Sequence, residues 1–539
     1  MKKKTHSGRP RRKTSFRKHF ARREFSPGHK ASPAPGKKSR IEVDPANAGG
    51  DFSYILERYD FPSGFDKRCR DEAARACKKN TAPGERLDLT AENIITIDGE
   101  TARDFDDAVS INTITSGFLL GVHIADVSHY IAMNSWLDRE AQKRGNSVYL
   151  LDQVIPMLPE ELSNDLCSLV EGKPRLTCSC FMHISMQGKI LSYDFKKSLI
   201  KSRKRCTYRE VQDILDGKKA DTELESLLAK ASVLARLLGE KRLEFGSIDF
   251  ETDEQQITLD AKGFPVEIKR KQRLFSEQII EEFMLCANIC AAEKLTVQKT
   301  GIFRVHDAPD EKKIRTFLET VHDLGYRIKE AGHKNRYQAF LENITDEERK
   351  RVLSTLLLHC MKQAKYSVNN TGHYGLGFPR YTHFTSPIRR CSDLIVHRML
   401  FADSGRLVYS ADELEKIAEK TSLCERTAVE AERDLYKIKS ARFMAGLIGK
   451  IFNTVVSGII PRGIFVQDPA TGIEGFVSAY AFPESSRYNE EKKIFQKKDG
   501  SPLYFTGDRI RVKLIKVNTA RCFIDFVPVE SQKFSNRHF

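Results

Sequence analysis

The stretch I-I-T-I-D-G-E-T-A-R-D-F-D-D-A at residues 94–108 places four aspartates, Asp98, Asp104, Asp106 and Asp107, directly after a run rich in β-branched residues. Carboxylates this close repel one another, and they all stay ionised only when cations lie among their oxygens. The hard oxygen donors of aspartate suit Mg²⁺ or Mn²⁺ rather than zinc. The pattern therefore indicates metal-assisted attack on a phosphodiester.

An acidic surface loop is the alternative interpretation of the same residues, because aspartate is common in loops. An EF-hand is disfavoured, since that loop requires glycine at its sixth position and glutamate at its twelfth, where this chain has Arg103 and Val109. Phe105 and Ala108 also argue against a purely solvated loop, because such a loop has no use for apolar residues among its charges.

The composition suits a polyanionic partner, but its basic excess is confined to one end. The chain of 539 residues carries a formal charge of +16, and residues 1–40 supply +14 of it. This segment has almost no apolar periodicity, so we predict a disordered basic tail over residues 1–50. The tail is either an arm that binds nucleic acid or a solubilising extension. No apolar segment of a secretory signal follows its charged start.

The cysteines and the hydropathy indicate a cytoplasmic protein. The 12 cysteines are scattered through the chain without a secretion signal, so reduced thiols are expected rather than disulfides. No stretch approaches 18 consecutive apolar residues, so no membrane span is predicted.

Patterning divides the rest of the chain into parts. Residues 51–87 predict a mostly helical linker with a charged helix over 66–79. Further strands are predicted at 118–124 and 177–184, and helices at 276–292 and 350–365. A long helix is expected from about residue 411 to 444, since no glycine or proline interrupts it. Short segments separated by glycine-bearing turns after residue 449 predict a small β-barrel. The fold class is therefore multidomain α+β.

Residues 96–108 (TIDGETARDFDDA) resemble the signature of the ribonuclease II/ribonuclease R (RNB) family of 3′→5′ exoribonucleases. The resemblance continues in the family's order at 122–130 (VHIADVSHY), 144–149 (RGNSVY), 154–159 (VIPMLP), 163–169 (SNDLCSL), 281–288 (EEFMLCAN) and 381–390 (YTHFTSPIRR). The last segment is closer to ribonuclease R than to ribonuclease II. The resemblance implies an RNB catalytic domain over 88–445, an S1-type OB-fold over 446–530 and a C-terminal tail over 531–539.

Ribonuclease R-type members usually carry two cold-shock OB-folds ahead of the catalytic region, each of about 70 residues. We expect none here, because only residues 51–87 separate the tail from the catalytic motifs.

The resemblance also assigns catalytic roles. It implies that Asp98, Asp104 and Asp107 hold Mg²⁺ or Mn²⁺, that Asp106 positions the attacking water, and that Arg389 contacts the scissile phosphate. Arg390 is an alternative to Arg389, because sequence alone cannot rank two adjacent arginines. In another interpretation Arg389 only pairs with Asp393.

Further residues match positions that bind RNA in the family. Tyr149 and Phe250 match an aromatic clamp that stacks on bases, and stacking tolerates any sequence. Tyr208 and Glu281 match positions linked to the preference for RNA over DNA, with Glu282 as the neighbouring alternative. We place Phe465 on the binding face of the barrel, against the alternative that it belongs to the barrel core.

The sequence thus predicts a monomeric, cytoplasmic 3′→5′ exoribonuclease that hydrolyses single-stranded RNA to nucleoside 5′-monophosphates, with ribosome or RNA-decay proteins as possible partners. The alternative is a non-hydrolytic RNA-binding protein that uses the basic tail and the OB-fold. The complete set of aspartates disfavours that alternative.

Overall fold

The computed structural model describes residues 40–78, 84–250, 254–329, 335–402, 408–490 and 492–529, and one compact unit begins at Ile41. The predicted tail up to residue 39 and the predicted C-terminal tail at 531–539 lie outside the described residues. Residues 41–50, which the sequence assigned to the disordered tail, belong to the folded unit. Val43 and Ala48 are buried there, which the low apolar content of the preceding residues did not reveal.

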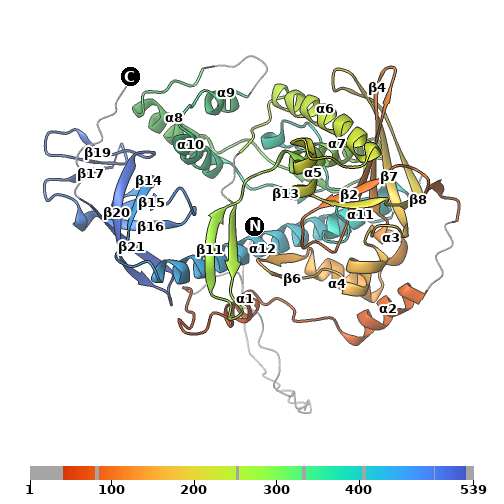
Figure 1. The fold of residues 1–539 in the computed structure, drawn as a ribbon, viewed down its shortest axis with the longest axis horizontal. Helices are drawn as coiled ribbons and strands as arrows, with labels where there is room; N and C mark the ends of the chain where they lie inside the picture. The colour runs from red at the N-terminus through yellow and green to blue at the C-terminus, as the bar shows by residue number, and fades with distance from the viewer. Residues whose placement is uncertain are drawn as a thin grey trace, which may run out of the picture. The chain divides into compact units, whose positions relative to one another are not determined.

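The largest sheet is mixed and has seven strands, in the order β1-β8-β7-β4-β3-β2-β9, with β2, β4, β7 and β8 towards the right of Figure 1. Neighbouring strands run antiparallel, except that β1 is parallel to β8 and β2 is parallel to β9. The strands are β1 (Leu87–Leu89), β2 (Ile95–Asp98), β3 (Asp107–Ile114), β4 (Gly117–Ala125), β7 (Pro174–Ser185), β8 (Ile190–Lys201) and β9 (Lys204–Thr207). The β-branched run at residues 94–97 supplies the first three residues of β2, and all of its side chains are buried, as is usual for a strand covered on both faces.

Helices α5 (Tyr208–Leu215), α6 (Thr222–Glu244), α7 (Phe275–Val297) and α11 (Cys391–Leu400) belong to the same core as the sheet. Helix α6 begins where the Asp221 side chain accepts hydrogen bonds from the backbone N–H groups of Glu223 and Leu224. Helix α7 is largely buried, because α5, α6, α11 and the sheet pack around it. It confirms the helix predicted at 276–292.

Short elements connect this core and carry several of the sequence motifs. They are α1 (Asp51–Tyr59), α2 (Lys67–Lys78), α3 (Val127–Tyr130), α4 (Trp136–Arg144), β5 (Val148–Leu150), β6 (Gln153–Ile155) and the π-helical turn η1 (Glu161–Leu166). Gly145 ends α4 with φ +73°, where a Cβ would lie 2.6 Å from the Cβ of Cys424. Glycine is therefore required at the point where the chain turns into β5.

A second hydrophobic cluster joins α8 (Glu311–Asp323), α9 (Arg336–Glu342) and α10 (Glu347–Cys360). The helix predicted at 350–365 was too long. Helix α10 ends at Cys360, because Lys365–Ser367 forms β13 and pairs with β12 (Phe303–Val305). The 3₁₀ turn η2 (Tyr374–Leu376) follows β13.

The long helix α12 (Ala411–Ala445) leads to a closed barrel, as predicted. The barrel strands are β14 (Ile451–Ile460), β15 (Gly463–Gln467), β16 (Glu474–Ser478), β20 (Arg509–Asn518) and β21 (Phe523–Pro528). After the 3₁₀ turn η3 (Ala479–Ala481), a small separate sheet consists of β17 (Arg487–Asn489), β18 (Ile494–Gln496) and β19 (Pro502–Tyr504). The hairpin of β10 (Gln255–Leu259) and β11 (Pro265–Arg270) contacts the barrel, where Gln255 donates to the carbonyl of Thr471.

A buried charge network joins the start of the folded unit to α12. Asp51 is 1% exposed and accepts hydrogen bonds from Lys439 Nζ at 2.8 Å and from Arg442 Nε at 2.8 Å. Arg442 also donates to the carbonyls of Asp44 and Pro45. Residues 44–51 are thus attached to α12 by charge-assisted bonds.

Replacing Asp51 by alanine should destabilise the protein, because Lys439 and Arg442 then remain buried without their anion. Removing one partner of a buried ion pair costs about 3–5 kcal/mol. The measurement is urea unfolding of the full chain. Glu42→Ala is the matched control, because its pair with Arg521 is largely exposed and should contribute less than about 1 kcal/mol. Equal stability of the two variants would contradict this role of Asp51.

Candidate active site

The four aspartates lie where two neighbouring strands meet. Asp98 is the last residue of β2 and Asp107 the first of β3. The two strands are hydrogen-bonded neighbours, and the loop between them carries Asp104 and Asp106. Residues 98–107, from the end of β2 to the start of β3, thus carry all four carboxylates and are called the aspartate loop.

Asp106 is the most firmly held of the four. It is 3% exposed, and its Oδ1 accepts a hydrogen bond from the backbone N–H of Ile388 at 2.8 Å. Among the described residues its Oδ2 has no hydrogen-bond partner, and it lies 3.6 Å from Nε of Arg389. Its carbonyl accepts from the N–H of Ala125 at 2.9 Å. One carboxylate oxygen is thus fixed by the protein backbone, and the other faces an arginine.

Burial perturbs the ionisation of these acids. Burial, reinforced by Asp107 and Asp104, raises the pKa of Asp98 to about 8. Burial raises the pKa of Asp107 to about 6 against the opposing charges of Arg389 and Arg390, and it raises the pKa of Asp106 well above its usual range. Such carboxylates ionise together only beside added positive charge, and a bound divalent cation supplies that charge.

The two adjacent arginines have different surroundings. The Arg389 side chain is 44% exposed, faces Asp106, and donates to Ser386 Oγ at 3.0 Å. The Arg390 side chain is 20% exposed and donates to Oδ1 of the fully buried Asp393 at 2.7 Å. The interpretation that paired Arg389 with Asp393 is therefore wrong, since Arg390 makes that pair. Arg389 is the arginine that the structure places beside the aspartates.

Tyr149 in β5 is linked to the aspartate loop. Its hydroxyl donates to Asp104 Oδ2 at 2.6 Å, and the residue is 39% exposed. The backbone N–H of Ser147 donates to the carbonyl of Arg389 at 2.9 Å, and Asn146 forms an isolated β-bridge with Arg390. The segment that carries Tyr149 therefore lies against the segment that carries the arginines.

The residues matched to sugar recognition lie on α5 and α7. Tyr208 begins α5, and burial, together with the nearby Asp107 and Asp98, raises the pKa of its hydroxyl. Glu281 is exposed and accepts a hydrogen bond from Arg273, whereas Glu282 is 6% exposed and paired with Arg242. Of the two glutamates, Glu281 is the one open to a ligand.

The predicted aromatic residues occupy different surroundings. Phe250 packs partly against the cluster of α8, α9 and α10. Phe465 is partly exposed and lies opposite Phe476 on the neighbouring strand, with ring centres 5.3 Å apart. Ile464 and Val466 on either side of Phe465 are fully buried. Phe465 therefore belongs to the outer face of the barrel, and the alternative that placed it in the core is wrong.

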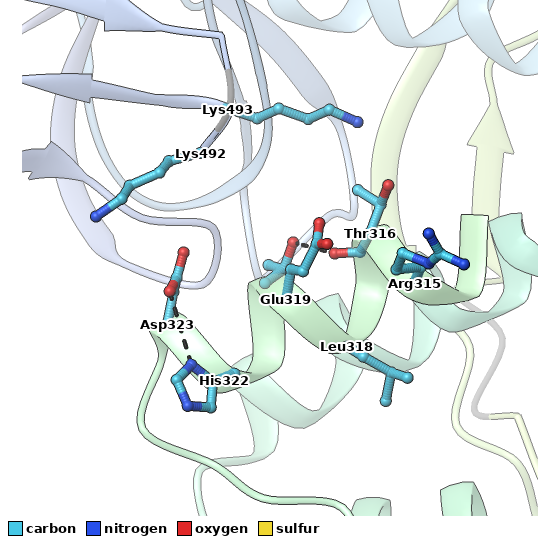
Figure 2. Close-up of a pocket in the computed structure, with 9 residues that line it drawn as sticks. Arg315, Thr316, Leu318, Glu319, His322, Asp323, Lys492 and Lys493 are labelled. Carbon is cyan, nitrogen blue, oxygen red and sulfur yellow. Dashed lines mark hydrogen bonds and ion pairs between the residues drawn. The ribbon is translucent and has the colours of Figure 1, made fainter. Parts of the chain in front are cut away.

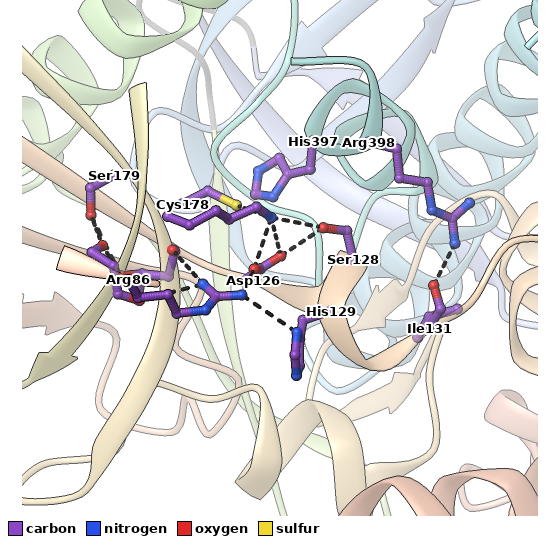
Figure 3. Close-up of polar contacts among 12 residues, drawn as sticks. Arg86, Asp126, Ser128, His129, Ile131, Cys178, Ser179, His397 and Arg398 are labelled. Atoms are coloured by element: carbon purple, nitrogen blue, oxygen red, sulfur yellow. Dashed lines mark hydrogen bonds and ion pairs between the residues drawn. The ribbon is translucent and has the colours of Figure 1, made fainter. Parts of the chain in front are cut away.

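A second cluster of potential metal ligands surrounds Asp126, whose charge is already balanced. Asp126, Cys178 and His397 are the described residues that bring three possible metal ligands within 4.8 Å of one another (Figure 3). Lys197 Nζ lies 2.8 Å from both Asp126 oxygens, and Arg86 donates to the same carboxylate at 2.6 Å. Although burial opposes it, these two cations hold the pKa of Asp126 well below its usual range. The ammonium occupies the place that a metal would need.

The oxygen donors at the aspartate loop fit a hard divalent cation better than the ligand atoms of the Asp126 cluster do. Asp98 Oδ2 is buried and has no hydrogen-bond partner among the described residues. Asp104 and Asp107 add carboxylate oxygens, the ligands that Mg²⁺ and Mn²⁺ prefer. Among the described residues, these oxygens do not all lie within 4.8 Å of one another, as the ligand atoms of the Asp126 cluster do.

A surface hollow of about 410 Å³ is lined by residues other than those predicted for the site (Figure 2). Residues of α8, among them Arg315, Glu319 and Asp323, line it together with Lys492 and Lys493. Both acidic and basic side chains line the hollow, and none of the predicted site residues is among them. It does not form part of the candidate active site.

Sequence reasoning missed several groups in the site. The N–H of Ile388 and the side chain of Ser386 carry no chemical signature, so nothing in the sequence distinguishes them. Arg205 lies among other basic residues at 201–205, so the sequence does not distinguish it from them. Phe476 could have been found, because it alternates with Gly475 and Val477 as Phe465 alternates with its neighbours.

Comparisons with known proteins agree with this geometry. Residues 86–402, which contain the four aspartates and both arginines, match the family model described as the RNB domain. Ribonuclease R of Thermotoga maritima is 40% identical over 530 residues, covering 93% of this chain and 74% of that protein. Ribonuclease R 1 of Lactococcus lactis is 38% identical over 503 residues, covering 90% of this chain and 61% of that protein.

A solved structure is also similar. The structure of Mycoplasma genitalium RNase R in complex with ribose methylated single-stranded RNA has a TM-score of 0.85 and 29% sequence identity, and the match covers 90% of this chain and 78% of that chain. Within the described ranges, no helix is both long and apolar enough to cross a bilayer.

The two arginines should respond differently to substitution. Arg390→Ala leaves Asp393 buried without its cation and should lower the free energy of unfolding by about 3 kcal/mol. Arg389→Ala removes a half-exposed side chain and should change stability by less than about 1 kcal/mol. Urea unfolding of both variants measures the difference. An equal loss in the two variants would show that their surroundings are not distinct.

Proposed function

Because the chain belongs to the RNB family, as a 3′→5′ exoribonuclease of the ribonuclease R type that acts on RNA, we propose that it hydrolyses single-stranded RNA to nucleoside 5′-monophosphates with Mg²⁺ or Mn²⁺. The observation that carries this proposal is the gathering of four aspartates in one loop, with Arg389 beside Asp106. We place this activity in RNA degradation and processing in the cytoplasm, by a monomer.

In this proposal Asp98, Asp104 and Asp107 hold the divalent ion. When bound, the ion would supply Lewis-acid chemistry that activates water and stabilises the leaving oxygen. Asp106 orients the attacking water through Oδ2, because its Oδ1 is held by the N–H of Ile388. A carboxylate fixed at one oxygen keeps the other in a defined direction.

Arg389 stabilises the charge that develops on the scissile phosphate. Ser386 anchors its guanidinium, and 44% of the side chain remains exposed for a substrate. A fixed guanidinium matches the oxygens of a phosphate. Arg390 contributes by fixing the same loop through Asp393 rather than by direct contact with RNA.

The remaining predicted residues bind the RNA chain. Tyr149 and Phe250 stack on bases near the scissile bond, and Phe465 with Phe476 offers a stacking surface on the barrel. Glu281 accepts a hydrogen bond from a ribose 2′-hydroxyl, and Tyr208 shapes the channel near the sugar. The similar M. genitalium structure, which holds single-stranded RNA, supports RNA as the ligand.

The direct test is digestion of RNA labelled at its 3′ or its 5′ end, with Mg²⁺ or with EDTA. Hydrolysis from the 3′ end releases labelled mononucleotide from the 3′-labelled strand at once, and shortens the 5′-labelled strand progressively. Protein that shifts the RNA in a gel but releases no nucleotide would support the alternative of a non-hydrolytic RNA-binding protein.

Asp106→Asn should lower turnover by about 10²-fold or more, because the amide keeps the shape of the side chain but loses its charge and basicity. RNA affinity should remain close to that of the wild type. Single-turnover digestion and a binding isotherm measure the two quantities. Asp152→Asn, at an exposed aspartate of the β5–β6 turn, is the matched control and should leave both unchanged. Substantial turnover of Asp106→Asn with normal metal dependence would refute the assignment.

Glu281→Ala should lower the rate on RNA and narrow the difference between RNA and DNA. A charge-assisted hydrogen bond to the 2′-hydroxyl favours RNA by about 1.5–3 kcal/mol. The double variant with Tyr208→Ala should admit DNA better than either single variant. The readout is the ratio of degradation rates on matched RNA and DNA oligomers at saturation. If both rates fall together and the ratio is unchanged, the two residues have only a structural role.

A further inference from the structure

Arg205 lies beside the aspartate loop but belongs to a strand distant in sequence. Arg205 lies in β9, which runs parallel to β2. The register of the two strands pairs Arg205 with Thr96. The register places Thr207 of β9 opposite Asp98, so the Arg205 side chain starts two residues before the end of β2 that carries the first carboxylate. From there it reaches the loop that follows Asp98.

The guanidinium of Arg205 holds the backbone of that loop. Its Nη2 donates to the carbonyl of Gly99 at 2.6 Å and to the carbonyl of Glu100 at 3.1 Å. Its central carbon lies 5.6 Å from the ring centre of Phe105, the residue between Asp104 and Asp106. One side chain therefore contacts both the start of the loop and the part that carries two of the acids.

Arg205 is itself anchored. Its backbone N–H donates to Glu171 Oε2 at 2.8 Å, whereas its Nε is buried without a hydrogen-bond partner among the described residues. The nearby Arg203 differs, because its side chain is 48% exposed and pairs with Glu223 on α6. Arg203 and Arg205, two residues apart in the chain, thus have different side-chain partners.

We propose that Arg205 is a positioning residue that fixes the course of residues 99–105, so that the carboxylates of Asp98, Asp104 and Asp107 can converge on a divalent cation. This inference rests on the proposed function, which assigns the cation to those carboxylates. Arg205 acts through the backbone carbonyls and the Phe105 ring, and it contacts neither the reacting phosphate nor the cation in this role.

The sign of the effect on metal affinity separates positioning from simple electrostatics. A positive charge beside ionised carboxylates repels a cation, so at a pH above the pKa of Asp98, which is about 8, loss of that charge alone should tighten metal binding. If Arg205 positions the loop, its loss lets the carboxylates move apart and weakens binding, despite the favourable change in charge. The two explanations predict changes in opposite directions.

The experiment is titration of the full chain with Mn²⁺ in the absence of RNA, with free Mn²⁺ followed by electron paramagnetic resonance. The variants are Arg205→Ala, Arg205→Lys and the control Arg203→Ala. We expect Arg205→Ala to weaken Mn²⁺ binding at least tenfold and Arg203→Ala to leave it unchanged. Arg205→Lys keeps the charge but loses the planar guanidinium, so its affinity should lie between those of Arg205→Ala and the wild type.

Arg205→Lys also decides the question if Arg205→Ala fails to fold. If the wild type binds Mn²⁺ and the folded Arg205 variants bind it equally well or more tightly, the role of Arg205 is overturned, whereas the proposed function is not. A wild type that binds no Mn²⁺ would instead overturn the proposed function. The Mn²⁺ concentration at half-maximal RNA hydrolysis should rise in parallel with the dissociation constant, while turnover at saturating Mn²⁺ recovers most of its wild-type value.

Discussion

Mutual repulsion of carboxylates at the junction of β2 and β3 is the constraint on which the site depends. Burial already disfavours the charges of Asp98, Asp106 and Asp107, and the neighbouring acids add to that cost at Asp98. A fold that keeps these groups together must supply positive charge and fixed hydrogen-bond donors around them. Three segments distant from the loop in sequence meet this demand.

Each segment contributes a different interaction. The loop before α11 provides the N–H of Ile388 and the guanidinium of Arg389, β5 provides the Tyr149 hydroxyl, and β9 provides Arg205. The Asp126 cluster shows the contrasting solution, since Lys197 and Arg86 neutralise it completely within the protein. The aspartate loop keeps an excess of negative charge, and that excess distinguishes a site for a cation from a structural ion-pair network.

The sequence was informative where the determinants are local. The aspartates occupy a single short stretch, β4 and β7 contain the strands predicted at 118–124 and 177–184, and α12 contains no helix breaker, so each was predictable from its own residues. The end of α10 was not, because β13 forms only through pairing with the distant β12. The N–H of Ile388 lies 282 residues from Asp106, and neighbouring arginines look alike until their partners are known. Determinants of this kind are tertiary, which is why Arg389 and Arg390 could be distinguished only in the folded chain.

The most direct test of the central claim is an anomalous diffraction map of crystals of the Asp106→Asn variant grown with Mn²⁺ and a short single-stranded RNA. The expected result is a manganese peak at the carboxylate oxygens of Asp98, Asp104 and Asp107, with Arg389 at the phosphate nearest the 3′ end. A manganese peak at the Asp126 cluster, or well-ordered RNA with no peak at the aspartate loop, would contradict the claim that repulsion among these carboxylates is relieved by a catalytic cation.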